Sequence, residues 1–589
     1  MRGLAPAALQ DHYLASLRQV IRGFAAGGPL VVVCEDLHWA DASSVEALAK
    51  LLSVVDEVAV LLALTGRPNR DSPGWDLVSE ARRRFGEALL EVPLSSLSEG
   101  ASRQLIGHLL EIESLPERTR TLLLSKTEGN PFFVEEVVRM LIDRGALERR
   151  GDTWVASAEV ASLDIPDTVH GLLLARIDQL PTQAKRTLKV ASLVGRQFPV
   201  GVVEEVLHTT AGLDDDRLDL TPLEASGLIR LDTVEPELEY AFRHALIQEA
   251  AYQSVLKQER RLLHQAVGEV LERRYPDRHA ELAAVLAHHF EQAGAIERAV
   301  DHLIAAGQYA LQRFANPEAH GFFSQALAHL PTGDDDPRTL RRRVEAGLGW
   351  AQAGASFIPY DEELQHLEAI MPAAEALGDQ RLLALLHLQI ALARQRAGEQ
   401  YLSSEAMQYA LDRAREIGEA LEDPWLTALP MAVLGEAKVW AAEFHDAIRL
   451  LEQATVLLEE REDLTRAAWY LGMLAVAYAR LGEFPAADEA ARREGAIASH
   501  SGDPNALLDA ELTRGLVETV RGNLDEAVTL TQRGVAIAEE VGNIACEFAG
   551  NFFLGDQHLR MGRPDEAVPA LERCGELARY WDAGGIENL

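Results

Sequence analysis

The residues best suited to chemistry follow an apolar run near the start of the chain, in the stretch PLVVVCEDLHWADASS (29–44). Two acids, Glu35 and Asp36, come directly after this run. In an open α/β sheet, ligands bind beyond the carboxyl ends of the strands. A carboxylate there can hold Mg²⁺, directly or through water, and a neighbouring carboxylate can orient an attacking water molecule. The structural alternative is that the two acids only cap the turn after the strand.

The elements that would position these acids follow a strand–helix–strand order. Two runs are rich in Val and Leu, as expected of parallel strands buried on both faces, and a helical pattern lies between them. Ser43 is the predicted N-cap of that helix, and Glu46 would complete a capping box. One βαβ crossover would then place both acids at a strand end. The predicted elements are helices over 7–24 and 43–55 and strands over 29–34, 57–65 and 88–94.

The next part of the chain is mostly helical in pattern. Asn130 followed by Pro131 predicts a helix start, with a cap residue before a proline at the first helical position, and Gly145 predicts the end of that helix. Residues 146–160 are predicted to form a linker hairpin. Helices with a small hairpin then indicate a winged-helix module. That module would occupy residues 165–275, with strands around 228–233 and 238–245.

An internal repeat is visible in the Ala- and Leu-rich part that begins near residue 280. Four segments align at a spacing of 40 residues, and each has an alanine at the same place. The unit is a helix–turn–helix in which a small residue ends the first helix and the alanine lets the second helix approach closely. Such repeats stack into a superhelix with a concave binding face, and the alternative is a scaffold without a ligand. The four segments are 442–447, 482–487, 522–527 and 562–567, with looser copies that include 293–299 and one that ends at Ala406.

Four other side chains could have a functional role. His38 and Trp39 adjoin the acids and could shape the turn after the strand, but Trp39 is interpreted as a packing anchor. His288 and His289 are predicted to be structural histidines rather than metal ligands, because they lie on a repeat helix without partners at ligand spacing.

Composition limits the classes of function. The chain has 56 Lys and Arg against 92 Asp and Glu, a net charge of −36, which argues against broad contact with nucleic acids or anionic membranes. The three cysteines are far apart, which argues against a disulfide framework or a zinc site. Neither a signal peptide nor a membrane span is apparent in the sequence. A cytoplasmic location is therefore expected.

The segment VVVCEDLHWADASSVEALAKLL resembles the Walker B segment of the STAND (AAA-like) signal-transduction ATPases. More narrowly, it resembles the ATPase cores fused to class III adenylate/guanylate cyclases and those of large LuxR-type regulators. The resemblance implies that Glu35 binds Mg²⁺ through water and that Asp36 polarises the attacking water. ATP and ADP with Mg²⁺ are the implied cofactors of the complete protein.

Further segments match that family in the same order, and the resemblance covers nearly the whole chain. In LLALTGRP (61–68), Thr65 and Arg67 would face the γ-phosphate. In GNPFFVEE (129–136), Pro131 would pack beside the nucleotide base. His244, in FRHALIQEAAY (242–252), corresponds to the phosphate-sensing histidine of related switch ATPases. The segment IPDTVHGLLLARIDQLP (165–181) resembles the start of the winged-helix region, and the repeats resemble tetratricopeptide repeats in their 40-residue form.

The chain departs from the family pattern in one essential part. A P-loop requires G-x-x-x-x-G-K-[ST], whose backbone N–H groups cradle the phosphates and whose lysine reaches the β and γ oxygens. None of the six lysines follows a glycine, and only 34 residues precede Glu35. We therefore expect an N-terminally truncated protein that lacks Walker A, or alternatively a degenerate switch that has lost nucleotide binding. The chain alone is expected to be inactive as an ATPase.

The expected fold is mainly α. It comprises a partial P-loop α/β core over 1–96, a small helical domain and linker over 97–160, a winged-helix region over 161–275 and an α-solenoid of tetratricopeptide-like repeats over 276–589. One functional hypothesis is a regulatory ATPase whose repeats sense a protein or small-molecule effector, with a cyclase or DNA-binding output domain outside this chain. The other is a non-catalytic interaction scaffold with a vestigial ATPase region. Neither hypothesis expects direct contact with nucleic acid or with a membrane.

Overall fold

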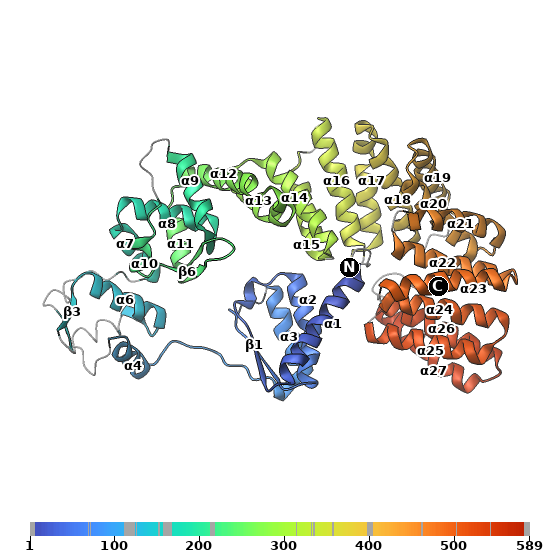
Figure 1. Cartoon of the computed structure of the whole chain (residues 1–589), viewed down its shortest axis with the longest axis horizontal. Helices are drawn as coiled ribbons and strands as arrows, with labels where there is room; N and C mark the ends of the chain where they lie inside the picture. Colours follow the sequence, from blue (N-terminus) through green and yellow to red (C-terminus); the bar gives the residue numbers. More distant parts are fainter. Residues whose placement is uncertain are drawn as a thin grey trace. The chain divides into compact units, whose positions relative to one another are not determined.

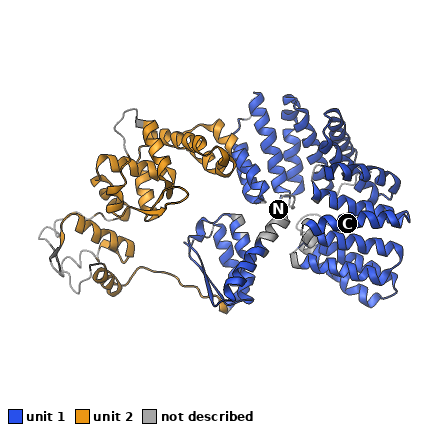
Figure 2. Ribbon diagram, in the orientation of Figure 1, with its two compact units in different colours: residues 1–86, 303–589 blue, residues 87–302 orange. Residues whose placement is uncertain are grey.

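The computed structural model divides the chain into two compact units, residues 1–86 with 303–589 and residues 87–302 (Figures 1 and 2). Among the residues it describes, no helix combines the length and the hydropathy that a membrane span needs. The residues outside the description are 1–5, 69, 71, 111–123, 125, 151–152, 157–165, 167, 212–217, 314, 332, 334–335, 356–357, 397–403, 461–462, 502–503, 542 and 582–589.

The N-terminal part of the first unit contains the predicted strand–helix–strand order. Strands β1 (Leu30–Cys34) and β2 (Val60–Leu64) pair in parallel, from Leu30 opposite Val60 to Cys34 opposite Leu64. A small apolar cluster centred on Leu14, Leu51 and Val54 packs beside them. The accompanying helices are α1 (Pro6–Ala25), the 3₁₀ helix η1 (Leu37–Trp39), α2 (Ala42–Leu51), the 3₁₀ helix η2 (Leu52–Asp56), α3 (Pro73–Phe85) and the 3₁₀ turn η3 (Gly86–Ala88).

Three predictions for this region are wrong. The N-cap of α2 is Asp41, whose carboxylate accepts a hydrogen bond from the Ser44 backbone N–H at 2.7 Å, so the predicted Ser43 cap lies inside the helix. The strands are not buried on both faces, because Val31 and Val33 of β1 and Leu61 of β2 are exposed. Segment 88–94 is not a strand, since no strand of the described residues pairs with it, and its side chains Leu90, Val92 and Leu94 are exposed.

Residues 87–302 form the second unit, which is built around one large apolar core. The predicted hairpin is present, as β6 (Ile229–Thr233) pairs with β7 (Glu239–Phe242), and β5 (Gln197–Pro199), which was not predicted, adds a third antiparallel strand in the order β5–β7–β6. The predicted linker hairpin is also present as β3 (Leu147–Arg150) and β4 (Thr153–Ala156). The helices are α4 (Glu99–Leu110), α6 (Pro131–Asp143), α7 (Val169–Gln179), α8 (Thr182–Val194), α9 (Val200–Ala211), α10 (Thr221–Ala225), α11 (Ala245–Gln253), α12 (Lys257–Arg274), η5 (Pro276–Arg278) and α13 (His279–Ala293).

From α14 (Ile296–Gln312) onward, helices follow one another in antiparallel pairs, as the repeat pattern predicts (Figure 1). Each helix packs on the next, and the first helices of successive pairs also contact one another, as in α18–α20, α20–α22 and α22–α24. The remaining helices are α15 (Asn316–His329), α16 (Pro337–Gly354), α17 (Tyr360–Leu377), α18 (Gln380–Arg396), α19 (Glu405–Ala420), α20 (Pro424–Trp440), α21 (Phe444–Glu460), α22 (Leu464–Arg480), α23 (Phe484–Ser501), α24 (Pro504–Arg521), α25 (Leu524–Val541), α26 (Ile544–Arg560) and α27 (Pro564–Trp581).

The repeated alanines have the role that the spacing predicts. Ala447, Ala487, Ala527 and Ala567 are all buried, each one turn into the second helix of its pair. The copy predicted to end at Ala406 is one residue out of register, because Ala406 is exposed and Met407 is buried in its place. Chain reversal between the helices requires a left-handed residue, which is glycine in three repeats (Gly482, Gly522 and Gly562) and alanine in the fourth (Ala442, φ 61°).

Replacing Ala442 with glycine is expected to raise the free energy of unfolding of this repeat by about 0.5–1 kcal/mol, because an L residue with a Cβ is strained at positive φ. The matched reverse change is Gly482→Ala, where an added Cβ meets nothing within 4 Å, so that backbone strain alone acts. Amide hydrogen exchange in α20 and α22 measures both changes. Equal protection in wild type and A442G would contradict the prediction.

Candidate functional site

The side chains predicted at the strand ends of the first unit are brought together. The Asp36 backbone N–H donates a hydrogen bond to Thr65 Oγ1 at 3.3 Å, and the Leu37 N–H donates to the Thr65 carbonyl oxygen at 2.8 Å. The Thr65 N–H in turn donates to the Cys34 carbonyl oxygen at 2.9 Å, which continues the ladder past the ends of β1 and β2. Glu35, Asp36 and Thr65 therefore meet at one edge of the sheet.

The turn after β1 is tightly constrained. Asp36 has a left-handed backbone (φ 56°), which is unusual for a residue other than glycine and is typical of functional turns. Leu37 is buried, and its carbonyl oxygen would lie 2.2 Å from a Cβ at Gly74, so only glycine fits opposite this turn. The packing of Leu37 against α3 thus fixes the direction in which Asp36 leaves the strand.

The second strand end adds Arg67 and a histidine. The Arg67 backbone N–H donates to His38 Nδ1 at 3.4 Å, which ties the segment after β2 to the turn after β1. His38 Nε2 is buried and has no hydrogen-bond partner, whereas the Arg67 side chain is exposed. Trp39 is 61% exposed, so its interpretation as a packing anchor is wrong. This hydrogen bond joins residues 29 positions apart, each of which follows one of the two neighbouring strands.

The strand-end residues are better suited to bind the Mg²⁺ of a nucleotide complex than to bind its phosphates. Glu35 is exposed and Asp36 partly exposed, and carboxylate oxygens are the ligands that Mg²⁺ prefers. Arg67, two residues after Thr65, is the basic side chain predicted to meet a phosphate, and the sequence contains no glycine-rich loop with lysine. Among the described residues, no group of three or more His, Cys, Asp and Glu side chains forms a closed metal site. The residues present could thus hold one side of a magnesium–nucleotide complex.

The other two predicted site residues lie in the second unit. Asn130 caps α6, its Oδ1 accepting from the Phe133 N–H at 3.2 Å, and Pro131 occupies the first helical position as predicted. His244 caps α11, where its Nδ1 accepts from the Leu246 N–H at 3.2 Å. The imidazole stacks on the ring of Phe132 at 4.1 Å, so Pro131 and His244 belong to one neighbourhood. Phe132 is the residue that sequence analysis missed between them.

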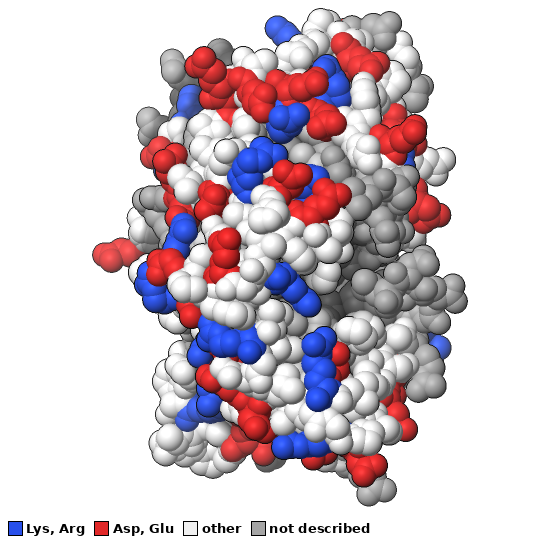
Figure 3. Space-filling view, turned by 90° about the vertical axis from the view of Figure 1, so that its right-hand side faces the viewer, with Lys and Arg blue, Asp and Glu red and all other residues white. Residues whose placement is uncertain are grey.

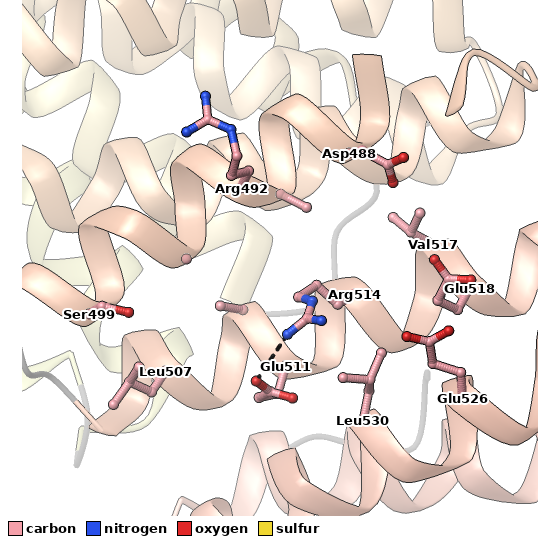
Figure 4. A pocket seen from close by; sticks show the side chains of 13 residues that line it. Asp488, Arg492, Ser499, Leu507, Glu511, Arg514, Val517, Glu518, Glu526 and Leu530 are labelled. Atoms are coloured by element: carbon pink, nitrogen blue, oxygen red, sulfur yellow. Dashed lines mark hydrogen bonds and ion pairs between the residues drawn. The ribbon is translucent and has the colours of Figure 1, made fainter. Parts of the chain in front are cut away.

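A cavity of about 480 Å³ lies in the repeats, between α23, α24 and α25 (Figure 4). Asp488, Glu518 and Glu526 lie together at one end, and Leu507 lies at the other. Arg514 projects into the middle and pairs with Glu511 at 3.4 Å. Arg521, which pairs with both Asp488 and Glu518, already neutralises part of the acidic end. The cavity therefore offers mixed charge beside apolar walls rather than a single strong charge.

The surface of the molecule in Figure 3 carries acidic and basic side chains interspersed with one another. Ion pairs in the repeats join charged side chains of different helices, such as Arg493 with Glu459 at 2.7 Å and Arg573 with Glu547 at 2.8 Å. A nucleic-acid surface needs basic side chains gathered over many phosphates. The face in Figure 3 shows no such continuous basic area.

Comparison with known proteins finds matches to parts of this chain. A family described as a domain of unknown function (DUF8739) matches residues 98–152. The uncharacterized protein R02095 of Rhizobium meliloti is 28% identical over 334 residues, which are 55% of this chain and 30% of that protein. The hybrid signal transduction histidine kinase G of Dictyostelium discoideum is 26% identical over 203 residues, 28% of this chain and 6% of the kinase. The chain thus spans less than a third of the length of either relative.

Among solved structures, the STAND protein with a tetratricopeptide repeat sensor PH0952 from Pyrococcus horikoshii is similar to this chain. The match covers 97% of this chain and 84% of that protein, with 16% sequence identity and a TM-score of 0.46.

Proposed function

We propose that this chain is the regulatory part of a STAND-type signal-transduction ATPase. The observation that carries the proposal is the strand-end cluster, in which Glu35 and Asp36 leave one parallel strand directly beside Thr65 on the next. In a Walker B role, Glu35 would hold Mg²⁺ through water, Asp36 would polarise the attacking water, and Thr65 with Arg67 would face the γ-phosphate.

The remaining regions would complete a two-state switch. The helical domain (97–160) and the winged-helix region (161–275) would contribute Pro131 beside the base and His244 as phosphate sensor. The stack of the half-buried Phe132 on His244 supports this, because it couples the start of α6 to the start of α11. The repeats (276–589) would bind an effector and bias the switch, since allostery requires two sites that act on one bistable element.

The phosphate-binding half of the site would lie outside this chain. The exposed apolar side chains of the two-stranded sheet support this, because Val31, Val33 and Leu61 are more than half exposed, whereas the helices that cover both faces of a complete parallel sheet would bury them. A cyclase or a DNA-binding output domain in the same polypeptide, and a cytoplasmic location, belong to the same proposal. The winged-helix region would act as an internal regulatory module rather than as a DNA reader.

The 589-residue chain is expected to show no ATP hydrolysis, because its sequence contains no G-x-x-x-x-G-K-[ST] motif to bind the triphosphate. If the DNA upstream of Met1 encodes G-x-x-x-x-G-K-[ST] in frame, the longer product should hydrolyse ATP, and Asp36→Ala should abolish the turnover. Asp56→Ala is the matched control, since that acid only forms an exposed ion pair with Arg84. Turnover by the 589-residue chain that disappears on Asp36→Ala would contradict the proposal.

A second function is favoured by the repeats themselves. Their tightly packed helix pairs and the cavity between α23, α24 and α25 suit a non-catalytic scaffold that binds a protein or a small molecule. An in-frame stop codon directly before Met1, together with no detectable ATP binding, would favour this function over the ATPase switch.

A further inference from the structure

The helix pair α26 and α27 lies at the end of the stack of repeat helices (Figure 1). In the preceding pairs, the outer side is covered by the first helix of the next pair, as α26 covers α24 and α25. Among the described residues, no helix follows α27, and only α26 packs extensively on it. The outer side of this last pair is therefore uncovered within the described part of the chain.

Two apolar stripes form one surface on this outer side. Phe552, Gly555 and Leu559 are spaced i, i+3 and i+7 on α26 and therefore share one side of that helix. Val568 and Leu571 are spaced i and i+3 on α27. An added Cβ at Gly555 would lie 2.5 Å from Leu571 Cδ2, so the glycine lets Leu571 pack on α26 and join the two stripes. We name these five residues the end face.

The apolar side chains of the end face are exposed, although the matching positions one repeat earlier are buried. Phe552 and Leu559 are each 53% exposed. Val568 is 51% exposed and Leu571 is 37% exposed. A terminal repeat normally has a polar outer face, and a contiguous exposed apolar surface marks a contact site. The matching residues, 40 positions earlier, are Leu512, Thr519, Val528 and Thr531, and each is at most 9% exposed.

Contacts of α26 with the preceding pair show which kind of surface fits the end face. The Gln557 Nε2 of α26 donates hydrogen bonds to Thr519 Oγ1 and Thr531 Oγ1, both at 2.9 Å. On the end face, these two positions are Leu559 and Leu571, which offer no acceptor. A glutamine buried there would lose both hydrogen bonds, which costs free energy. The end face therefore fits an apolar surface better than it fits the polar side of α26.

We propose that the end face binds the end face of a second copy of this chain. The second copy supplies an apolar surface of the same area, carried by two helices at the same spacing. Two identical faces related by a two-fold axis form an isologous contact, which closes at two copies. Burial of aromatic and large aliphatic side chains at the centre of such a contact supplies most of its affinity.

The charges beside the end face allow two copies to meet. Arg560 pairs with Asp556 at 2.7 Å on α26, and Arg573 pairs with Glu576 at 3.0 Å on α27. Side chains of both signs thus accompany the stripes, whereas a block of like charges would repel a second copy. The net charge of −36 on each chain still opposes association at a distance, and salt screens that repulsion.

Sedimentation velocity of the 589-residue chain tests the proposal, at an ionic strength of about 0.15 M that screens charges more than about 8 Å apart. At about 10 µM protein, the main species is expected to have twice the 64.6 kDa mass of one chain. Larger species are not expected, because a two-fold contact leaves no end face free.

Leu559→Glu on α26 and Val568→Glu on α27 should each weaken dimerisation by at least about tenfold, because each would place a carboxylate in an apolar contact. Leu256→Glu is the matched control, since this leucine is 74% exposed and lies in the other unit, and that variant should dimerise like the wild type. Circular dichroism identifies any variant that fails to fold, and the variant on the other helix then provides the test.

A monomer at every protein concentration up to about 100 µM would overturn the proposal and leave the end face to a different partner. An unchanged dimer in the folded Leu559→Glu and Val568→Glu proteins would also overturn it, as would polymers that grow with concentration, because these need a heterologous contact. The end face contains none of the residues predicted to bind nucleotide, so failure of the ATPase function would appear only in the turnover measurements.

Discussion

Replacing Arg176 with methionine is expected to lower the free energy of unfolding of the 87–302 unit by about 3–5 kcal/mol. Arg176 is 5% exposed and forms an ion pair with Glu136, itself 2% exposed, and it also donates to the Ser226 carbonyl oxygen at 2.6 Å. Methionine would leave a buried carboxylate without its main cation, since Arg139 reaches Glu136 only at 3.9 Å. The measurement is amide hydrogen exchange across α6 and α7.

Two further variants separate the ion pair from simple loss of packing. The double change Arg176→Met with Glu136→Met should recover most of the lost stability, because the buried pair is then replaced by apolar side chains. Arg278→Met breaks an exposed pair with Glu281 in the same unit and should cost less than about 1 kcal/mol. A loss in R176M no larger than that in R278M would show that the buried pair is not a major stabilising contact.

Acidification from pH 6.5 to pH 4 is expected to destabilise the same unit by on the order of 3 kcal/mol through His264 alone. Burial lowers the pKa of His264 to about 4 and that of His289 to about 3, with the neighbouring histidines adding to both shifts. Their Nδ1 atoms lie 2.9 Å apart, and the Tyr252 hydroxyl contacts His264 Nε2 at 3.1 Å. As predicted from sequence, His289 has a structural position.

The direction of the pH effect follows from the lowered pKa values. Below pH 6.5 the unfolded chain protonates these histidines, whereas in the folded protein they are still neutral. Their contribution to the free energy of unfolding is therefore fully present above pH 6.5 and falls towards pH 4. Exchange rates in α12 and α13, measured as a function of pH, report this loss, and α25, which has no histidine, is the internal reference. His289→Gln should reduce the pH dependence in α12 and α13, and an unchanged slope in that variant would contradict the prediction.

Local patterns predicted most of the secondary structure because their causes are local. The cap Asn130 and the first-turn Pro131 act within one helical turn, and the alanines at 40-residue spacing act within one helix pair. The errors arose where the structure of a segment depends on neighbours that are distant in sequence. Segment 88–94 has the composition of a strand, but a strand forms only where another strand supplies hydrogen bonds.

The candidate site likewise combines positions that the sequence predicts with contacts that only the tertiary structure shows. Glu35, Asp36, Thr65 and Arg67 could be predicted together, because residues that follow neighbouring parallel strands meet at one sheet edge. Their roles in nucleotide chemistry stay predictions, as do the bounds of the four domains. Phe132 as the contact of His244 could not be predicted, since it joins the starts of two helices more than a hundred residues apart.

The sequence by itself determined the repeat architecture of this protein, because a fixed period of small residues leaves only one way to pack successive helix pairs. The tertiary structure alone decided which polar groups become buried together. Arg176 pairs with Glu136, which lies 40 residues away in the sequence. Such partners depend on how whole helices are placed against one another, and the local periodicity of the sequence does not predict that placement.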